Sequence, residues 1–178
     1  SAPWFDPNQP GNFDQYARKN RAITDIFEPG STFKLVSAAA LLESGKVGKD
    51  SLVYCENGKY RLYKTTIHDH KKYGWLTFEK VIANSSNIGI AKLSREHLSN
   101  KYLYQKICDF GFGQKTNIDL SGEAKGLFKP PEKWSGLTKA SVSFGHEIGV
   151  TAIQMANAFA VVANGGNLKK PFLIKEVR

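Results

Sequence analysis

Cysteine is scarce in this sequence. Cys55 and Cys108 are its two cysteines, and they form no C-x-x-C pair and have no metal-ligand spacing. Cys108 lies in an apolar helical pattern, which is typical of a small buried residue. A disulfide between two cysteines so far apart in the chain is not expected. The sequence therefore gives no basis for a thiol redox centre or a cysteine-ligated zinc site.

Long apolar runs are missing as well. The two longest, residues 35–42 and 155–163, are each interrupted by a polar residue. Both fall well short of the roughly 20 residues that a membrane-spanning helix needs. No signal-peptide pattern is visible. The sequence opens abruptly with Ser1-Ala2-Pro3-Trp4, so we expect it to be a piece excised from a longer protein.

Compact basic segments are also absent. Lys and Arg number 25 against 16 Asp and Glu, which gives a net charge of +9, but the excess is spread along the chain. No dense run of Lys and Arg alternates with aromatic residues, which argues against nucleic acid as a partner. A basic surface favours anionic partners in general, such as a cell-wall polymer or an acidic membrane surface. With 41% hydrophobic and 23% charged residues, the chain is expected to be one globular domain or a large part of one.

Apolar residues recur at helical spacing along most of the chain. Helices are expected over residues 31–42, 78–83, 88–98, 99–110 and 152–163. The first is apolar on nearly every face, which predicts a buried central helix that stops near Gly45. Thr77 and Ser99 are expected helix caps, and Thr151 with Gln154 is an expected capping box. Residues 1–30 and 111–140 are expected to be mainly irregular.

Strand signals are fewer. Asn57-Gly58 between apolar and aromatic runs predicts a β-hairpin within residues 52–67. Residues 171–177 alternate enough in polarity to predict a strand. No internal repeat is found. The expected fold class is α/β and predominantly helical.

A serine and a lysine stand three residues apart at the start of the first helix. Ser31-Thr32-Phe33-Lys34 fits S-x-x-K, and residues i and i+3 share one helix face. A serine needs a base to act as a nucleophile, and a lysine can serve when burial lowers its pKa. The other interpretation is that Ser31 or Thr32 only caps the helix while Lys34 reaches solvent. The apolar surroundings of Lys34 favour the catalytic interpretation.

A second motif, Ser85-Ser86-Asn87, falls at an expected break between two helices. A serine near a Ser–Lys pair can relay a proton to a leaving amine. An asparagine offers both a donor and an acceptor to a substrate amide. Taken alone, the motif is more typical of an ordinary break in which Ser86 or Asn87 caps the next helix.

The two motifs together resemble the penicillin-binding protein family, whose signature is S-x-x-K, S-D-N and K-T-G. The second motif looks like the class B form, with Ser86 where the signature has Asp. The resemblance extends over residues 1–178, because further blocks occur in family order: Arg21-Ala22-Ile23-Thr24-Asp25-Ile26-Phe27-Glu28-Pro29-Gly30 before Ser31, then Ile88-Gly89, Phe110-Gly111-Phe112-Gly113, Ile118-Asp119-Leu120, Ser143-Phe144-Gly145 and Val150-Thr151. It implies part of one transpeptidase domain with the serine acyltransferase, β-lactamase-like fold.

The resemblance also implies a function. Ser31 would be the acylated nucleophile, Lys34 its base and Ser85 a partner in proton transfer, while Asn87 would hold the substrate amide. The substrates would be peptidoglycan stem peptides ending in D-Ala-D-Ala, and β-lactams would trap Ser31 as an ester. No metal and no cofactor is implied. The parent protein would be membrane-anchored, at the periplasmic face of the inner membrane, with division or elongation complex proteins as partners.

The sequence departs from the family pattern in two places. No Lys-Ser/Thr-Gly triplet occurs in the 178 residues, since Lys115-Thr116-Asn117 has Asn in place of Gly. We therefore expect the C-terminal part of the domain, with its third motif, to lie beyond this sequence. At His146-Glu147, many relatives carry Gln-Gly. A non-catalytic sensor or scaffold that binds peptidoglycan or a β-lactam is the alternative function.

His68-Asp69-His70 is the remaining candidate for a functional cluster. On a strand, both histidines would share one face. No third or fourth ligand is evident nearby, so a solvated turn is the favoured interpretation over a metal site.

Overall fold

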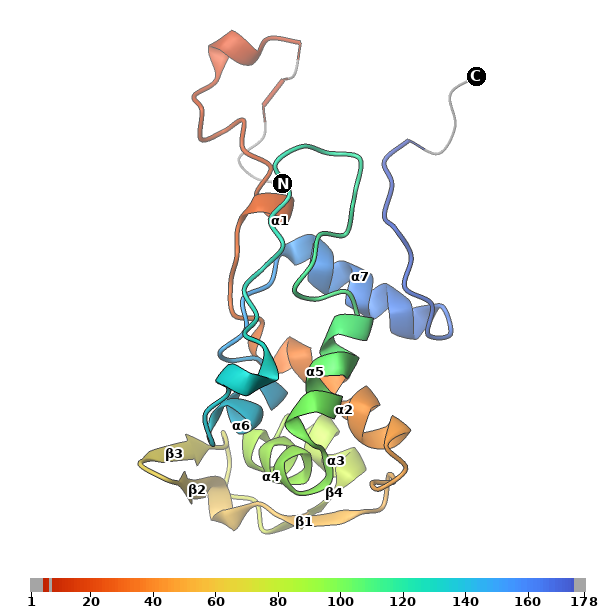
Figure 1. The fold of residues 1–178 in the computed structure, drawn as a ribbon. Helices are drawn as coiled ribbons and strands as arrows, with labels where there is room; N and C mark the ends of the chain where they lie inside the picture. The colour runs from red at the N-terminus through yellow and green to blue at the C-terminus, as the bar shows by residue number, and fades with distance from the viewer. Residues whose placement is uncertain (1–4, 7, 175–178) are drawn as a thin grey trace.

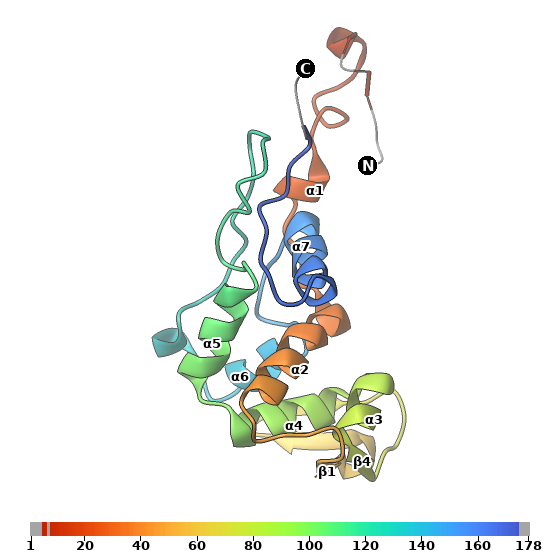
Figure 2. The same ribbon diagram turned by 90° about the vertical axis from the view of Figure 1, so that its right-hand side faces the viewer.

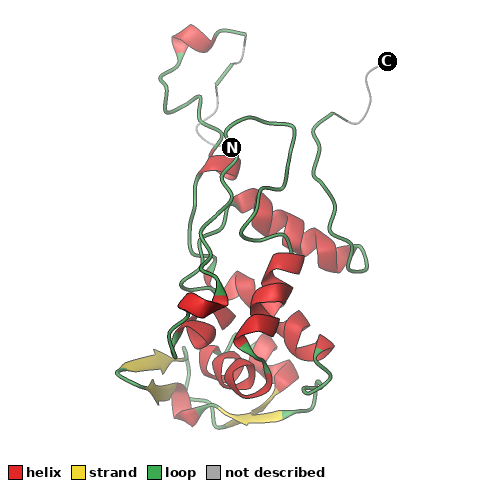
Figure 3. Ribbon diagram, in the orientation of Figure 1, coloured by secondary structure: helices red, strands yellow, loops and turns green. Residues whose placement is uncertain are grey.

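Helices are the main regular secondary structure of this computed structural model, which describes residues 5–6 and 8–174 (Figures 1 and 3). Within these described residues, four strands form two small antiparallel pairs beside the helices. The helices are α1 (Arg21–Thr24), α2 (Lys34–Glu43), α3 (Phe78–Ala83), α4 (Asn87–His97), α5 (Asn100–Asp109), α6 (Thr138–Ser143) and α7 (Ala152–Ala163), and the strands are β1 (Leu52–Tyr54), β2 (Lys59–Leu62), β3 (Thr65–His68) and β4 (Trp75–Thr77). The expected α/β, predominantly helical class is confirmed.

Helix α4 lies at the centre of the packed half of the molecule. It contacts α2, α3 and α6, and also strands β1 and β3. In Figures 1 and 2 these elements gather at one end, while α1, α7 and the loop after α5 extend toward the other. Gly89 lets α4 approach α3 closely, because a Cβ there would lie 2.5 Å from Cγ2 of Val81 on α3. Helix α4, which begins at the last residue of the second motif, is therefore the element around which α2, α3 and α6 pack.

Local capping signals in the sequence identify the helix starts well. The side chain of Thr77 accepts from the backbone N–H of Lys80, that of Ser99 accepts from Tyr102, and Thr151 with Gln154 forms the predicted capping box. Gly45 has a φ of +69° just after α2, which suits glycine in the left-handed conformation that ends a helix. These predictions are confirmed.

The predicted burial of the first helix holds for one face only. A 3₁₀ turn (Gly30–Phe33) leads directly into α2. Val36, Ala40 and Leu41 of α2 are fully buried, whereas Leu42 is 50% exposed. The helix therefore packs as one side of the core, and α4 holds the central place.

The predicted hairpin has its turn in the wrong position. Strand β1 pairs with β4, and β2 pairs with β3 through a turn at residues 63–64, where Tyr63 has a φ of +56°. Asn57-Gly58 instead lies in a 3₁₀ turn (Glu56–Gly58). Its glycine is needed for close approach, because a Cβ at Gly58 would lie 2.9 Å from the carbonyl oxygen of Lys71. The Asn-Gly signal marks a real backbone constraint but not the hairpin turn.

Two further predictions need correction. Residues 171–174 are not in a strand, and residues 175–177 lie outside the described residues. A strand needs a hydrogen-bonded neighbour, and none lies beside this segment in the part of the chain that the structure describes; Phe172, Leu173 and Ile174 are exposed. Residues 111–140 are not wholly irregular, because α6 begins at Thr138 and buries Ala140 and Val142.

Within the described part of the chain, no helix combines the length and the hydrophobicity needed to cross a bilayer.

Two buried hydroxyls in the core provide a test of the packing. Ser37 on α2 and Ser94 on α4 are fully buried, and their Oγ atoms have no hydrogen-bond partner among the described residues. Ser37→Ala and Ser94→Ala should each raise the free energy of unfolding by about 0.5–1 kcal/mol, because a buried unsatisfied polar group is removed. Denaturant unfolding measures the change.

The matched control is Ser143→Ala. Ser143 is equally buried, but its Oγ donates to the carbonyl of Ala140 at 2.7 Å. This variant should lower stability by about 1 kcal/mol. Destabilisation of the same size at Ser37 or Ser94 would show that those hydroxyls are hydrogen-bonded after all.

Candidate active site

Ser31 lies on the surface, at the point where the chain turns into α2. It is exposed and belongs to the 3₁₀ turn that precedes Lys34. Gly30, immediately before it, has a φ of +56°, a conformation that glycine adopts without steric cost. The turn presents the hydroxyl of Ser31 outward at the start of a helix, where backbone N–H groups give a positive potential.

The amine of Lys34 joins the two sequence motifs. Lys34 is only 3% exposed, so the interpretation in which it reaches solvent is wrong. Its Nζ donates to Oγ of Ser31 at 3.2 Å, to Oγ of Ser85 at 2.9 Å and to the carbonyl oxygen of Ser85 at 2.5 Å. The structure thus brings Ser31, Lys34 and Ser85 together, as the helical spacing and the break at Ser85 predict.

Burial changes the acid–base chemistry of this amine. Desolvation lowers the pKa of Lys34 from 10.5 to about 8, while the charge of Asp69 acts in the opposite direction. An amine with a pKa near 8 is neutral in about a tenth of the molecules at pH 7. Lys34 can therefore accept a proton from Ser31 under ordinary conditions.

Ser85 owes its position to an unusual backbone conformation. Its φ is +54°, which is disfavoured for a residue with a Cβ. The chain reverses here at the end of α3, because Ser85 N–H donates to the carbonyl of Ile82 and Ser86 N–H donates to that of Val81. The reversal places both the hydroxyl and the carbonyl of Ser85 within reach of Lys34.

The start of α4 is held by a residue that the sequence did not single out for this purpose. Oδ2 of Asp69 accepts from Oγ of Ser86 at 2.7 Å, and Oδ1 accepts from the backbone N–H groups of Asn87 and Ile88 at 2.6 and 3.0 Å. Asp69 precedes α4 by many residues, so no local capping pattern could reveal it. In the sequence it stood out only as part of a weak metal candidate.

Asn87 lies at the first position of α4, two residues after Ser85. It is partly exposed, and its Nδ2 donates to the carbonyl of His68 at 3.0 Å. His68 and Asp69 therefore both anchor the second motif. Among the described residues, no three His, Cys, Asp or Glu side chains are grouped so as to hold a metal ion.

Two more of the sequence blocks, the one that contains Phe112 and the one that ends at Gly145, contact the turn that carries Ser31. The ring of Phe112 meets that of Phe33 edge-on, with centroids 5.2 Å apart. The N–H of Gly30 donates to the carbonyl of Gly145 at 3.1 Å. A Cβ at Gly145 would collide with the backbone of Gly30. The Phe-Gly and Ser-Phe-Gly blocks are thus explained by contact with the turn that carries Ser31.

The structure also explains His146-Glu147. Glu28 accepts from the backbone N–H of Glu147 at 2.8 Å, and its other oxygen lies 3.0 Å from Nδ1 of His146. Glu147 has a φ of +58°. Glycine would adopt this conformation more easily, in agreement with the Gln-Gly that the family resemblance suggests here. The Glu147 side chain adds a contact with Thr138, whose Oγ1 donates to it at 2.8 Å.

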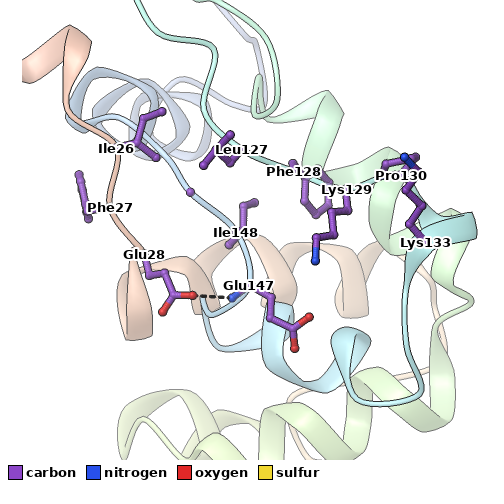
Figure 4. Close-up of a pocket in the computed structure, with 11 residues that line it drawn as sticks. Ile26, Phe27, Glu28, Leu127, Phe128, Lys129, Pro130, Lys133, Glu147 and Ile148 are labelled. Atoms are coloured by element: carbon purple, nitrogen blue, oxygen red, sulfur yellow. Dashed lines mark hydrogen bonds between the residues drawn. The ribbon is translucent and has the colours of Figure 1, made fainter.

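An apolar cavity of about 620 Å³ lies beside this segment and is lined by Glu28 and Glu147 among others (Figure 4). Its walls come from three segments that antiparallel bridges connect, Phe27 with Val150 and Leu127 with Gly149. Phe128 and Ile148 also line it, whereas Ser31, Lys34, Ser85 and Asn87 do not. The cavity and the candidate active site are therefore separate.

The chain matches the model of the "Penicillin binding protein transpeptidase domain" over residues 1–178. It is 36% identical over 174 residues to the "Probable peptidoglycan D,D-transpeptidase PbpC" of Pseudomonas aeruginosa, covering 98% of this chain and 31% of that protein. The chain thus spans about a third of the length of this curated relative.

Solved structures show the same similarity. The transpeptidase domain of penicillin-binding protein 3 from Burkholderia pseudomallei has a TM-score of 0.85 and 31% identity, covering 90% of this chain and 48% of that one. Penicillin-binding protein 3 from Mycobacterium tuberculosis, complexed with aztreonam, has a TM-score of 0.83 and 33% identity, covering 96% and 38%. The expected transpeptidase fold is confirmed.

The left-handed conformation of Ser85 makes a testable prediction about stability. Ser85→Gly and Ser85→Ala both remove the hydroxyl, but glycine alone relieves the backbone strain. The glycine variant should be more stable by about 1 kcal/mol in denaturant unfolding.

A control within a regular helix should show the opposite sign. Ala156 is an exposed residue inside α7, and Ala156→Gly should cost about 1 kcal/mol. If the glycine variant at position 85 were also the less stable one, Ser85 would not hold a strained conformation.

Proposed function

The chain belongs to the penicillin-binding protein transpeptidase family, and from this premise we propose that the protein carrying it cross-links peptidoglycan as a serine D,D-transpeptidase. The substrates are stem peptides that end in D-Ala-D-Ala. The single observation that carries the proposal is the position of the Lys34 amine, which is buried and contacts both Ser31 and Ser85. This arrangement suits a base that activates one hydroxyl and exchanges protons with another.

The geometry supports an acyl transfer in two steps. Ser31 Oγ attacks the carbonyl carbon of the penultimate D-Ala, and its proton passes to neutral Lys34. The peptide bond then breaks, and the terminal D-Ala leaves with a proton delivered through Ser85. In the second step, the amine of another stem peptide attacks the ester on Ser31, loses its proton to the same base and releases the serine.

Asn87 is the proposed holder of the substrate amide. It is the last residue of the second motif and the first of α4, and it is partly exposed. Because His68 already accepts from its Nδ2, the orientation of the amide group is fixed before a substrate arrives, and this lowers the entropy cost of binding.

β-Lactams are proposed ligands of the same site, where they would acylate Ser31. The related Mycobacterium tuberculosis protein is described as complexed with aztreonam and with ampicillin. The parent protein is proposed to be anchored in the inner membrane with this domain on the periplasmic side, where its substrate lies. Partners from a division or elongation complex belong to the same proposal.

The 178 residues contain two of the three catalytic motifs in the family signature, S-x-x-K and Ser-x-Asn. By the resemblance, the third motif binds the substrate carboxylate and its strand gives the second oxyanion donor. Loss of one such donor costs about 3–4 kcal/mol, or a hundredfold or more in rate. These residues alone are therefore proposed to acylate slowly or not at all.

Incubation with a labelled penicillin followed by mass spectrometry tests the proposal. The full-length protein should be modified once, on Ser31, and Ser31→Ala and Lys34→Met should abolish the modification. The isolated 178-residue chain should react at least about a hundredfold more slowly.

The outcomes separate the alternatives. Acylation without any cross-linking of stem peptides would favour a sensor or scaffold over a transpeptidase. Modification that persists in Ser31→Ala would contradict the assignment of the nucleophile. Equal rates for the 178 residues and the full-length protein would show that the third motif is dispensable.

A further inference from the structure

Asp69 is hydrogen-bonded to the second motif and to the residue that follows it. Its carboxylate accepts three hydrogen bonds, from Ser86 Oγ, Asn87 N–H and Ile88 N–H. Two of these donors are backbone N–H groups at the start of α4, which an ordinary helix leaves without an intrahelical partner. A carboxylate at this end also interacts favourably with the helix dipole. Asp69 thus caps α4 from outside the helix.

The residue is itself held firmly. It follows β3 directly, and its backbone N–H donates to the carbonyl of Gly58 at 3.2 Å. The preceding residue, His68, accepts from the side chain of Asn87. The end of the β2–β3 hairpin is therefore attached both to the turn at Gly58 and to the first turn of α4.

Asp69 is linked to Ser85, one of the proposed reacting groups, through Ser86. Ser85 is bonded to Ser86, and its strained conformation persists only while its surroundings fix the chain on both sides. The end of α3 fixes one side through the carbonyls of Val81 and Ile82. Asp69 fixes the other side through Ser86, Asn87 and Ile88.

The charge of Asp69 acts on the same site. Lys34 is faced by Ser31 from the 3₁₀ turn, by Ser85 from the α3–α4 turn and by the nearby carboxylate of Asp69, whose charge raises the pKa of Lys34 against the effect of burial. Asp69 therefore affects both the positions of Ser85 and Asn87 and the pKa of Lys34, which determines how readily that amine becomes neutral.

We propose that Asp69 is a positioning residue for acyl transfer, which sets Ser85 and Asn87 against Lys34 by holding the start of α4. The inference rests on the proposed function and deepens it. Asp69 does not touch the substrate. It acts through the turn at Ser85 and through the first residues of α4.

Three variants of the full-length protein separate the two contributions. Asp69→Asn keeps the shape and one acceptor oxygen for the backbone N–H groups but removes the charge, whereas Asp69→Ala removes every hydrogen bond of the side chain. Asp50→Asn is the matched control, since Asp50 is exposed in the loop before β1. The second-order rate constant for acylation by a labelled penicillin is measured from pH 5.5 to 9.5 and normalised to folded protein by circular dichroism.

For Asp69→Ala we expect the plateau rate at high pH to fall at least about tenfold, since a displacement of about 1 Å costs on the order of a hundredfold. For Asp69→Asn we expect the acid limb of the profile to move to lower pH. The sign follows because removal of a negative charge lowers the pKa of Lys34, so the neutral base persists in more acidic solution. Asp50→Asn should match the wild type in both respects.

The proposal would be overturned if folded Asp69→Ala and Asp69→Asn both kept the wild-type plateau and acid limb, even with a lower melting temperature, because Asp69 would then serve stability alone. If the alanine variant does not fold, the profile of the asparagine variant decides. Absence of acylation in the wild type would refute the proposed function, and the role of Asp69 with it. Acylation of the wild type with unchanged variants would refute the role of Asp69 only.

Discussion

The buried amine of Lys34 is the interaction on which the site depends, because it ties the helix that follows Ser31 to the turn that carries Ser85. An amine without water must be satisfied by protein oxygens, and here two hydroxyls and one carbonyl accept from it. The same loss of water lowers its pKa to about 8. One contact therefore joins the two motifs in space and prepares a base, so the constraint that holds the site together also gives it its chemistry.

Several other features of the structure hold Ser31 and Ser85 in place beside Lys34. Ser85 has a strained φ that places it within reach of Lys34. Asp69 holds the start of α4, which follows Ser85 and Ser86. Gly145 lets the backbone of Gly30 approach closely, while Phe112 closes the core beneath Phe33. Sequence blocks that lie far apart in the chain are thus brought together around one turn and one lysine. A site built on buried helices and close backbone contacts is rigid enough to keep reacting groups in place.

The sequence predicted the parts of this structure that depend on near neighbours. Thr77, Ser99 and Thr151 cap helices through bonds to residues three positions on, and the pair Ser31–Lys34 follows from helical spacing. Prediction failed where distant segments decide the outcome. Asn57-Gly58 has hairpin chemistry, yet β1 pairs with the distant β4. Asp69 caps α4 across a long stretch of chain, whereas the sequence favoured a solvated turn for Asp69 and its neighbouring histidines. The exposure of Leu42 likewise depends on what packs beside α2, which periodicity along α2 cannot show.

The titration of Lys34 tests the central claim most directly. Lysine labelled with ¹³C at Cε gives a resonance that moves when the amine loses its proton, and Lys34→Met identifies the signal by its loss. We expect Lys34 to titrate near pH 8, well below the ordinary lysine value near 10.4. A midpoint above 10 in the folded protein would show that the amine is solvated and charged at neutral pH, and Lys34 would then not be the base that activates Ser31.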